Sequence, residues 1–226
     1  MGILDFLFPR RCVSCRRLGF YICPRCRLNI RKIETPVCSV CERPSIGGAT
    51  HPKCKTSFCL DGLTSIWVYD GPIKKAIKEL KYRFVTDLAR ELVSLIDTTL
   101  IYRYMRTVDF VLTPVPLHWW RLRWRGFNQA EILGKMIAEK LEIKFVPDLL
   151  TRKKPTRPQV ELEGKARREN IANAFAINPR FSKIHHPPSN ILLFDDVWTT
   201  GVTLRACGNV LKRAGVKSVW GLTLAK

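Results

Sequence analysis

The chain lacks any long apolar run. Nowhere in its 226 residues is there a stretch of the ~18 apolar residues that a membrane-spanning helix needs. The opening residues, MGILDFLFPRR, are too short for a secretory signal, and Asp5 interrupts their apolar part. We therefore expect a cytoplasmic protein that does not span the membrane and in which disulfides rarely persist.

Acidic residues are also scarce. The sequence has 19 Asp and Glu against 39 Lys and Arg, which gives a formal net charge of +20. A balance this basic favours a polyanionic partner: a nucleic acid, a phosphorylated ligand or an anionic membrane surface. Internal repeats and low-complexity tracts are missing as well, and a hydrophobic content of 46% indicates a folded chain.

Cysteine is almost missing after residue 60, where only Cys207 occurs, whereas the other eight cysteines all precede that point. We interpret Cys207 as a small buried residue of a helix. The first four cysteines form two Cys-x-x-Cys pairs separated by seven residues, so two tight turns can face one another. This spacing predicts a tetrahedral zinc site with four thiolate ligands: Cys12, Cys15, Cys23 and Cys26.

The remaining N-terminal cysteines predict a second zinc site. Cys38 and Cys41 form one half of it, and pairing His51 with Cys54 gives a two-residue gap in the other half. We therefore predict Cys38, Cys41, His51 and Cys54 as the ligands and place Cys59 in the core. The alternative is that Cys59 is the fourth ligand and His51 is merely exposed.

Both predicted sites have four protein ligands, which makes them structural, because no coordination position is left for a substrate. Residues 1–60 are too few to bury a stable core without such staples. We expect them to form a small double zinc-ribbon domain ahead of a larger domain, residues 61–226. Arginines and lysines crowd this first segment, where they either hold a nucleic-acid backbone or form a solvated surface.

After residue 60, strand-like apolar runs alternate with amphipathic helical patterns. This alternation predicts an α/β fold: a mainly parallel twisted sheet flanked by helices. The expected strands are Thr64–Tyr69, Val108–Thr113, Ile143–Val146, Ile191–Phe194 and Ser218–Leu224. The expected helices begin at Gly71, near Thr86 and near Asn128, and a fourth covers Val202–Ala214.

The string ILLFDDVWTTGVT, residues 191–203, is the most specific pattern in the chain. In a parallel sheet, ligands bind beyond the carboxyl ends of the strands, where this pair of aspartates falls. Two carboxylates can accept hydrogen bonds from the vicinal hydroxyls of a ribose, and the N-terminus of the following helix can bind a phosphate. We predict Asp195 and Asp196 at the sugar, and Val197, Thr199, Thr200, Gly201 and Thr203 around the phosphate. The alternative is an ordinary helix cap and turn.

A second pattern, HWWRLRWRGF at residues 118–127, alternates arginines with aromatic or aliphatic residues. Aromatic faces can stack on unpaired bases while guanidinium groups contact phosphates. The pattern predicts binding of single-stranded nucleic acid by Trp119, Trp120, Arg121, Arg123, Trp124 and Arg125. The alternative is that the tryptophans pack this loop against the sheet and the arginines bind pyrophosphate.

Residues 191–203 resemble the phosphoribosyl-pyrophosphate signature of the type I phosphoribosyltransferases. The chain as a whole resembles the ComF family, in which zinc knuckles precede a phosphoribosyltransferase-like domain. Three further segments carry the likeness: WVYDGPIKKAIKELKY (67–82), TPVPLHWWRLRWRGFNQA (113–130), and the set Thr156, Gln159, Leu162, Arg167, Asn170 and Phe175. The resemblance implies a role in natural competence, the handling of incoming single-stranded DNA at the inner face of the membrane.

The same resemblance implies further parts of the site. Pro116, Leu117 and His118 would belong to the pyrophosphate-binding loop, and Mg²⁺ would bridge the pyrophosphate oxygens and the ribose hydroxyls. Residues 152–168 would form a mobile loop over the ligand. The sequence departs from the family at His51, where cysteine is common, and at Glu161, where the mobile loop often has glycine.

Three functions stay open at this point. The first is a ComF-like competence protein that binds single-stranded DNA during DNA uptake and carries a phosphoribosyl-pyrophosphate pocket. The second is an active phosphoribosyltransferase of nucleotide salvage. The third is a non-catalytic adaptor for a helicase or a membrane translocation protein. The sequence does not decide whether the chain is an enzyme.

Overall fold

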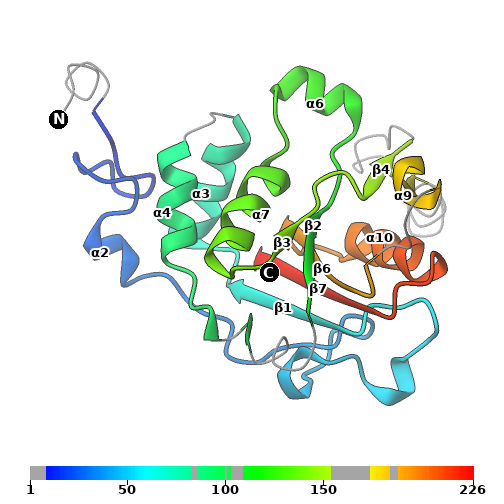
Figure 1. The fold of residues 1–226 in the computed structure, drawn as a ribbon. Helices are drawn as coiled ribbons and strands as arrows, with labels where there is room; N and C mark the ends of the chain where they lie inside the picture. Colours follow the sequence, from blue (N-terminus) through cyan, green and yellow to red (C-terminus); the bar gives the residue numbers. More distant parts are fainter. Residues whose placement is uncertain (1–8, 83–85, 100, 103–108, 154–173, 184–187) are drawn as a thin grey trace, which may run out of the picture.

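The computed structural model describes residues 9–82, 86–99, 101–102, 109–153, 174–183 and 188–226 (Figure 1). Glu161 and most of the expected mobile loop lie outside these residues, as do Thr156, Gln159, Leu162, Arg167 and Asn170. Within the described part, no helix is long and apolar enough to cross a membrane.

A parallel five-stranded sheet forms the centre of the molecule, with the strand order β1-β7-β6-β2-β3. Its strands are β1 (Gly62–Trp67), β2 (Val111–Pro114), β3 (Lys144–Phe145), β6 (Asn190–Val197) and β7 (Ser218–Ala225). Each expected strand corresponds to one of these. The prediction of an α/β fold with a mainly parallel sheet is therefore confirmed.

Helices cover both faces of this sheet (Figure 1). Leu192 and Phe194 of β6 pack into a hydrophobic cluster with α3, α4 and α7, whereas Ile191 and Leu193 pack into a second cluster with α10. Successive side chains of a strand point to opposite faces, so an uninterrupted apolar run is what a strand buried on both faces requires. The four helices are α3 (Gly71–Tyr82), α4 (Thr86–Ser94), α7 (Gln129–Lys140) and α10 (Val202–Arg213).

Several short elements were not expected from the sequence. β4 (Leu150–Arg152) and β5 (Phe175–Ile177) form a separate antiparallel pair, and the arginine- and tryptophan-rich segment forms a helix, α6 (Trp119–Arg125). A five-residue helix, α9 (Pro179–Lys183), precedes β6. Elements this short contain too few residues to show a period of 2 or 3.6.

Between residues 9 and 60, the described N-terminal segment has three short helices: α2 (Pro24–Arg27), η1 (Ile46–Gly48) and η2 (Pro52–Cys54). Around them, two groups of four side chains each bring their potential ligand atoms within 4.8 Å of one another. The groups are Cys12, Cys15, Cys23 and Cys26, and Cys38, Cys41, His51 and Cys54. Four soft donors at this spacing fit tetrahedral Zn²⁺, so the chain has two Cys-rich clusters suited to structural zinc.

The second cluster contains His51 and leaves Cys59 outside. Nδ1 of His51 lies 3.4 Å from Sγ of Cys41, and its Nε2 lies 3.0 Å from the carbonyl oxygen of Pro44. A carbonyl acceptor on Nε2 directs Nδ1 toward a metal, as in many zinc sites. The Cys59 thiol instead contacts the backbone of Thr56 at 3.3 Å. Cys59 is half-buried, so the expectation that it belongs to the core is wrong.

The first Cys-rich cluster, formed by Cys12, Cys15, Cys23 and Cys26, packs onto the larger part of the chain. Cys12, Cys23 and Cys26 belong to the same hydrophobic cluster as the residues of α3, α4 and α7. A carboxylate of α4, Glu91, accepts hydrogen bonds from the backbone amides of Tyr21 and Ile22 and from Arg27, the last at 2.7 Å. The N-terminal segment therefore shares its apolar core with the helices that cover the sheet.

We expect two zinc ions per chain, and replacement of Cys59 by Ser should leave both in place. Replacement of Cys54 by Ser should remove one, because three donors remain in the second cluster. Atomic absorption on the purified full-length variants measures this directly. Loss of one zinc from the Cys59→Ser variant would transfer the fourth ligand position from His51 to Cys59.

Candidate functional site

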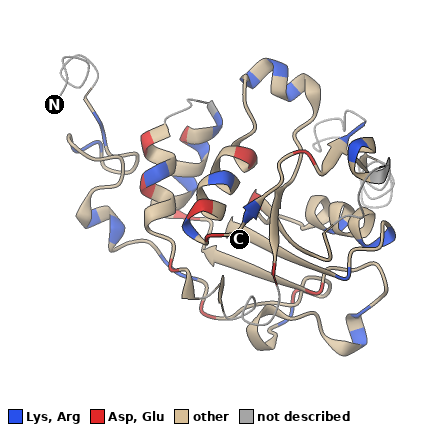
Figure 2. Ribbon diagram, in the orientation of Figure 1, with Lys and Arg blue, Asp and Glu red and all other residues tan. Residues whose placement is uncertain are grey.

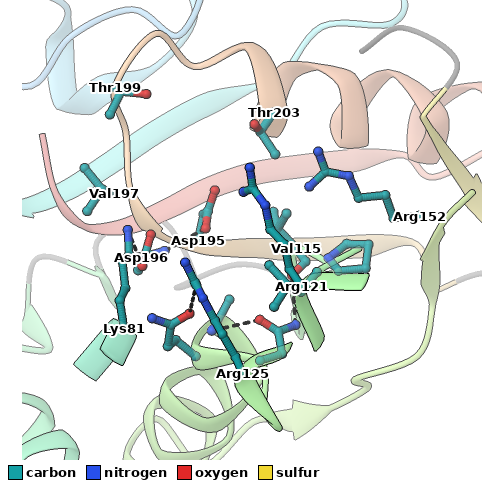
Figure 3. Close-up of a pocket in the computed structure, with 15 residues that line it drawn as sticks. Lys81, Val115, Arg121, Arg125, Arg152, Asp195, Asp196, Val197, Thr199 and Thr203 are labelled. Atoms are coloured by element: carbon teal, nitrogen blue, oxygen red, sulfur yellow. Dashed lines mark hydrogen bonds and ion pairs between the residues drawn. The ribbon is translucent and has the colours of Figure 1, made fainter. Parts of the chain in front are cut away.

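A cavity of about 370 Å³ opens at the carboxyl ends of β2 and β6 (Figure 3). This is the edge at which parallel α/β sheets bind ligands. The segment between β6 and α10 forms one wall, and the segment from β2 through α6 to the start of α7 forms another. The lining residues are Lys81, Val115, Pro116, Leu117, Arg121, Arg125, Asn128, Gln129, Ala130, Arg152, Asp195, Asp196, Val197, Thr199 and Thr203.

Both predicted carboxylates line this cavity. Asp195 and Asp196 lie near the end of β6. This strand extends to Val197, whereas the sequence predicted that it ends at Phe194. The backbone amide of Asp196 donates a hydrogen bond to Oδ1 of Asp195 at 2.9 Å. Burial, and then the neighbouring charge of Asp196, raise the pKa of Asp195 to about 7.

Lys81 is the counter-charge of this acidic pair. Its Nζ lies 3.0 Å from Oδ2 of Asp196, and the two side chains are 27% and 14% exposed. Burial lowers the pKa of Lys81, but the charges of Asp196 and then Asp195 outweigh this effect, and the net shift is upward. The lysine is therefore charged, and it reaches the carboxylates from the end of α3.

The loop between β6 and α10 turns at Gly201. This residue has φ +67°, and a Cβ there would lie 2.0 Å from the ring of Trp198, so only glycine fits without a shift. Val197, Thr199 and Thr203 face the cavity, whereas Thr200 and Gly201 are outside its lining. The assignment of all five residues to the phosphate stays a prediction.

Arg205 of α10 joins this loop to the second zinc cluster. Its guanidinium group donates to the carbonyl oxygen of Thr200 at 3.1 Å and to that of Ser39 at 2.6 Å, and it lies 5.0 Å from the ring of Trp198. Ser39 stands between the ligand pair Cys38 and Cys41 in the sequence. One side chain thus contacts the ligand loop and the metal-binding turn together.

The expected pyrophosphate loop contributes Pro116 and Leu117 to the cavity. His118 is not in the lining: it is 3% exposed, and its Nδ1 accepts a hydrogen bond from the amide of Trp120 at the start of α6. Burial, then the charges of Arg152 and Arg121, lower the pKa of His118. His118 therefore caps α6 as a neutral imidazole.

Helix α6 divides its side chains between the cavity and solvent. Arg121 and Arg125, four residues apart and hence on one side of the helix, line the cavity, and Arg125 donates to Gln129 at 2.8 Å. Exposed fractions are 58% for Trp119, 60% for Trp120 and 68% for Trp124. Packing of the tryptophans against the sheet, the alternative raised by the sequence, is therefore wrong. Arginine occupies every second position from 121 to 125 in this helix (Figure 2).

Six lining residues were not among the predicted site residues: Lys81, Val115, Asn128, Gln129, Ala130 and Arg152. Each lies within or beside a segment that carries the family resemblance, so that segment was the available signal. Arg152 enters the cavity from β4 and stacks on Phe175 of β5, with the guanidinium carbon 5.2 Å from the ring centre. The antiparallel pair therefore places a cation opposite the acidic pair.

The raised pKa of Asp195 predicts a measurable pH dependence of stability. A carboxyl group that binds its proton more tightly in the folded chain costs stability once pH rises from about 4 to about 7. Asp195→Asn removes this cost, so the variant should gain about 1–3 kcal/mol in free energy of unfolding at high pH.

Urea denaturation at about pH 6 and about pH 8 should show this gain growing with pH. Asp148→Asn is a matched control, because the Asp148 side chain is 48% exposed outside the cavity. The same pH dependence in both variants would contradict a raised pKa at Asp195.

The chain is similar to a family of known proteins. The family model described as the double zinc ribbon domain matches residues 3–56. Competence protein F of Haemophilus influenzae is 32% identical over 232 residues, a match that covers 96% of this chain and 98% of that protein. The DNA utilization protein YhgH of Salmonella typhimurium is 28% identical over 218 residues, covering 88% of this chain and 93% of that protein.

Among solved structures, adenine phosphoribosyltransferase from Leishmania donovani is similar with a TM-score of 0.37 and 17% identity, over 64% of this chain and 55% of that one. The likeness to competence protein F, at 32% identity, spans nearly the full length of both chains and includes the segment matched as a double zinc ribbon. The chain therefore belongs to the competence protein F, or ComF, family.

Proposed function

We propose that this protein handles single-stranded DNA during DNA uptake and binds phosphoribosyl pyrophosphate in the cavity at the end of β6. The observation that supports this most is the position of α6. Its arginines Arg121 and Arg125 line the cavity, while its three tryptophans are exposed to solvent. One short helix thus offers a phosphate-binding side and a base-stacking side.

In the proposed ligand complex, Asp195 and Asp196 accept hydrogen bonds from the two ribose hydroxyls. Thr199 and Thr203 donate to the 5-phosphate, which is favourably placed at the N-terminus of α10. The pyrophosphate lies toward Arg121, Arg125 and Arg152, three cations that line the same cavity.

Mg²⁺ fits this ligand, because pyrophosphate oxygens are among the donors that the ion prefers. When bound, it would neutralise charge on the pyrophosphate. The part of Asp195 and Asp196 is to orient the ribose and to place negative charge beside its anomeric carbon.

The strand is proposed to cross the outer side of α6. Large aromatic rings that are about 60% exposed are unusual in a soluble chain, and three of them share one seven-residue helix. Each stacked base contributes ~1–3 kcal/mol, and neighbouring arginines neutralise the phosphates. The names of the relatives, a competence protein and a DNA utilization protein, support the same reading.

Phosphoribosyl transfer is the second candidate function. The acidic pair favours it, because such a pair stabilises the positive charge that develops on the ribose during transfer. A helicase or translocation protein as partner, and peripheral attachment at the inner membrane, remain predictions from the family resemblance.

Strand binding can be tested on the double variant Trp120→Ala/Trp124→Ala. Loss of two stacking surfaces should weaken binding of labelled oligo(dT) at least about tenfold at matched salt. Fluorescence anisotropy measures the affinity. The variant Trp120→Phe/Trp124→Phe keeps two aromatic faces and should retain most of it. Equal affinity of the alanine variant and the wild type would remove α6 from the DNA interface.

The cavity can be tested on Asp195→Asn/Asp196→Asn. Calorimetric titration with phosphoribosyl pyrophosphate and Mg²⁺ should give heat with the wild type and none with the variant, because neutral amides hold the hydroxyls and the cation poorly. Binding of oligo(dT) should stay within about twofold of the wild type. A variant that still binds the ligand normally would contradict the assignment of the carboxylates. Pyrophosphate release with nucleobases present would identify transfer.

A further inference from the structure

We propose that Lys81 is the resident cation of the acidic pair, and that the cavity therefore binds the ribose phosphate portion of its ligand without a divalent metal. This inference rests on the proposed phosphoribosyl site and specifies how that site balances its charge.

Nζ of Lys81 lies 3.0 Å from Oδ2 of Asp196, which is the distance of a charge-assisted hydrogen bond. Figure 3 shows the lysine reaching the carboxylate from the side of the cavity away from Arg121 and Arg152. Both Lys81 and Asp196 line the cavity, so the ion pair faces the ligand space and is not hidden behind it.

The positive charges of the cavity come from separate elements of the fold. Among its lining residues, Arg121, Arg125 and Arg152 come from α6 and β4, whereas Lys81 comes from the end of α3. The arginines carry the forked geometry that suits phosphate oxygens. Lysine is a compact point charge, and this one is bound to a carboxylate, so the two kinds of cation have separate tasks.

A divalent ion that approached Asp196 directly would have to displace Lys81 or lie beside a second positive charge. Displacement would leave the ammonium group of Lys81, whose side chain is only 27% exposed, without its partner, which is costly. With Lys81 in place, the pair already has a counter-ion, and the carboxylate oxygens not used by Lys81 remain available to ribose hydroxyls.

Ribose 5-phosphate is the discriminating probe, because it lacks the pyrophosphate that would itself bind Mg²⁺. Calorimetric titration of the full-length zinc-loaded protein should give the same affinity, within about twofold, in EDTA-free metal-depleted buffer and in Mg²⁺. Lys81→Met should lose about tenfold in affinity in the metal-depleted buffer, or about 1.4 kcal/mol, and should regain part of it when Mg²⁺ is added. Lys81→Arg keeps the charge and should remain independent of Mg²⁺.

Lys78→Met is the matched control, since Lys78 lies one turn earlier on α3, is exposed and does not line the cavity. Zinc content and thermal unfolding of every variant establish that the fold is intact. Binding by the wild type only when Mg²⁺ is present would overturn the inference, as would unchanged or tighter binding by Lys81→Met. No binding by the wild type in either buffer would overturn the proposed function itself.

Discussion

The burial of β6 on both faces is the constraint on which the rest of this structure depends. Its apolar residues alternate between two hydrophobic clusters, and this holds the strand between β2 and β7 in the sheet. The strand continues for three residues after Phe194, so the backbone of Asp195 and Asp196 is held in place at the edge of the sheet. The strand that contains the two aspartates and the glycine turn that follows it restrict the backbone around both carboxylates. A site that orients a sugar needs such fixed groups.

The sequence predicted the regular part of this fold well, because long apolar runs and amphipathic repeats contain enough residues to show their period. The two zinc clusters were also predictable, since ligand spacing reflects the geometry of a tight turn. The short elements were not. The β4–β5 pair and α6 have three to seven residues each, and their conformation depends on contacts distant in the sequence.

The candidate site was predictable at the end of β6 but not on the facing wall. Asp195 and Asp196 follow an apolar run, so their position at the strand end could be inferred from the sequence. Lys81 and Arg152 come from elements that lie far apart along the chain, and only the folded structure brings them to the same cavity. His118 shows the opposite case: a residue next to the ligand loop in sequence serves to cap a helix.

The Arg205 contact connects the second Cys-rich cluster to the loop that follows β6. Its guanidinium group holds Ser39, from the metal-binding turn, and Thr200, from the ligand loop. Linkage is reciprocal, so whatever free energy an ordered metal turn contributes to ligand affinity, the bound ligand returns as tighter metal retention. Under the proposed function, a ligand bound in the cavity would therefore slow the loss of metal to a chelator through this contact.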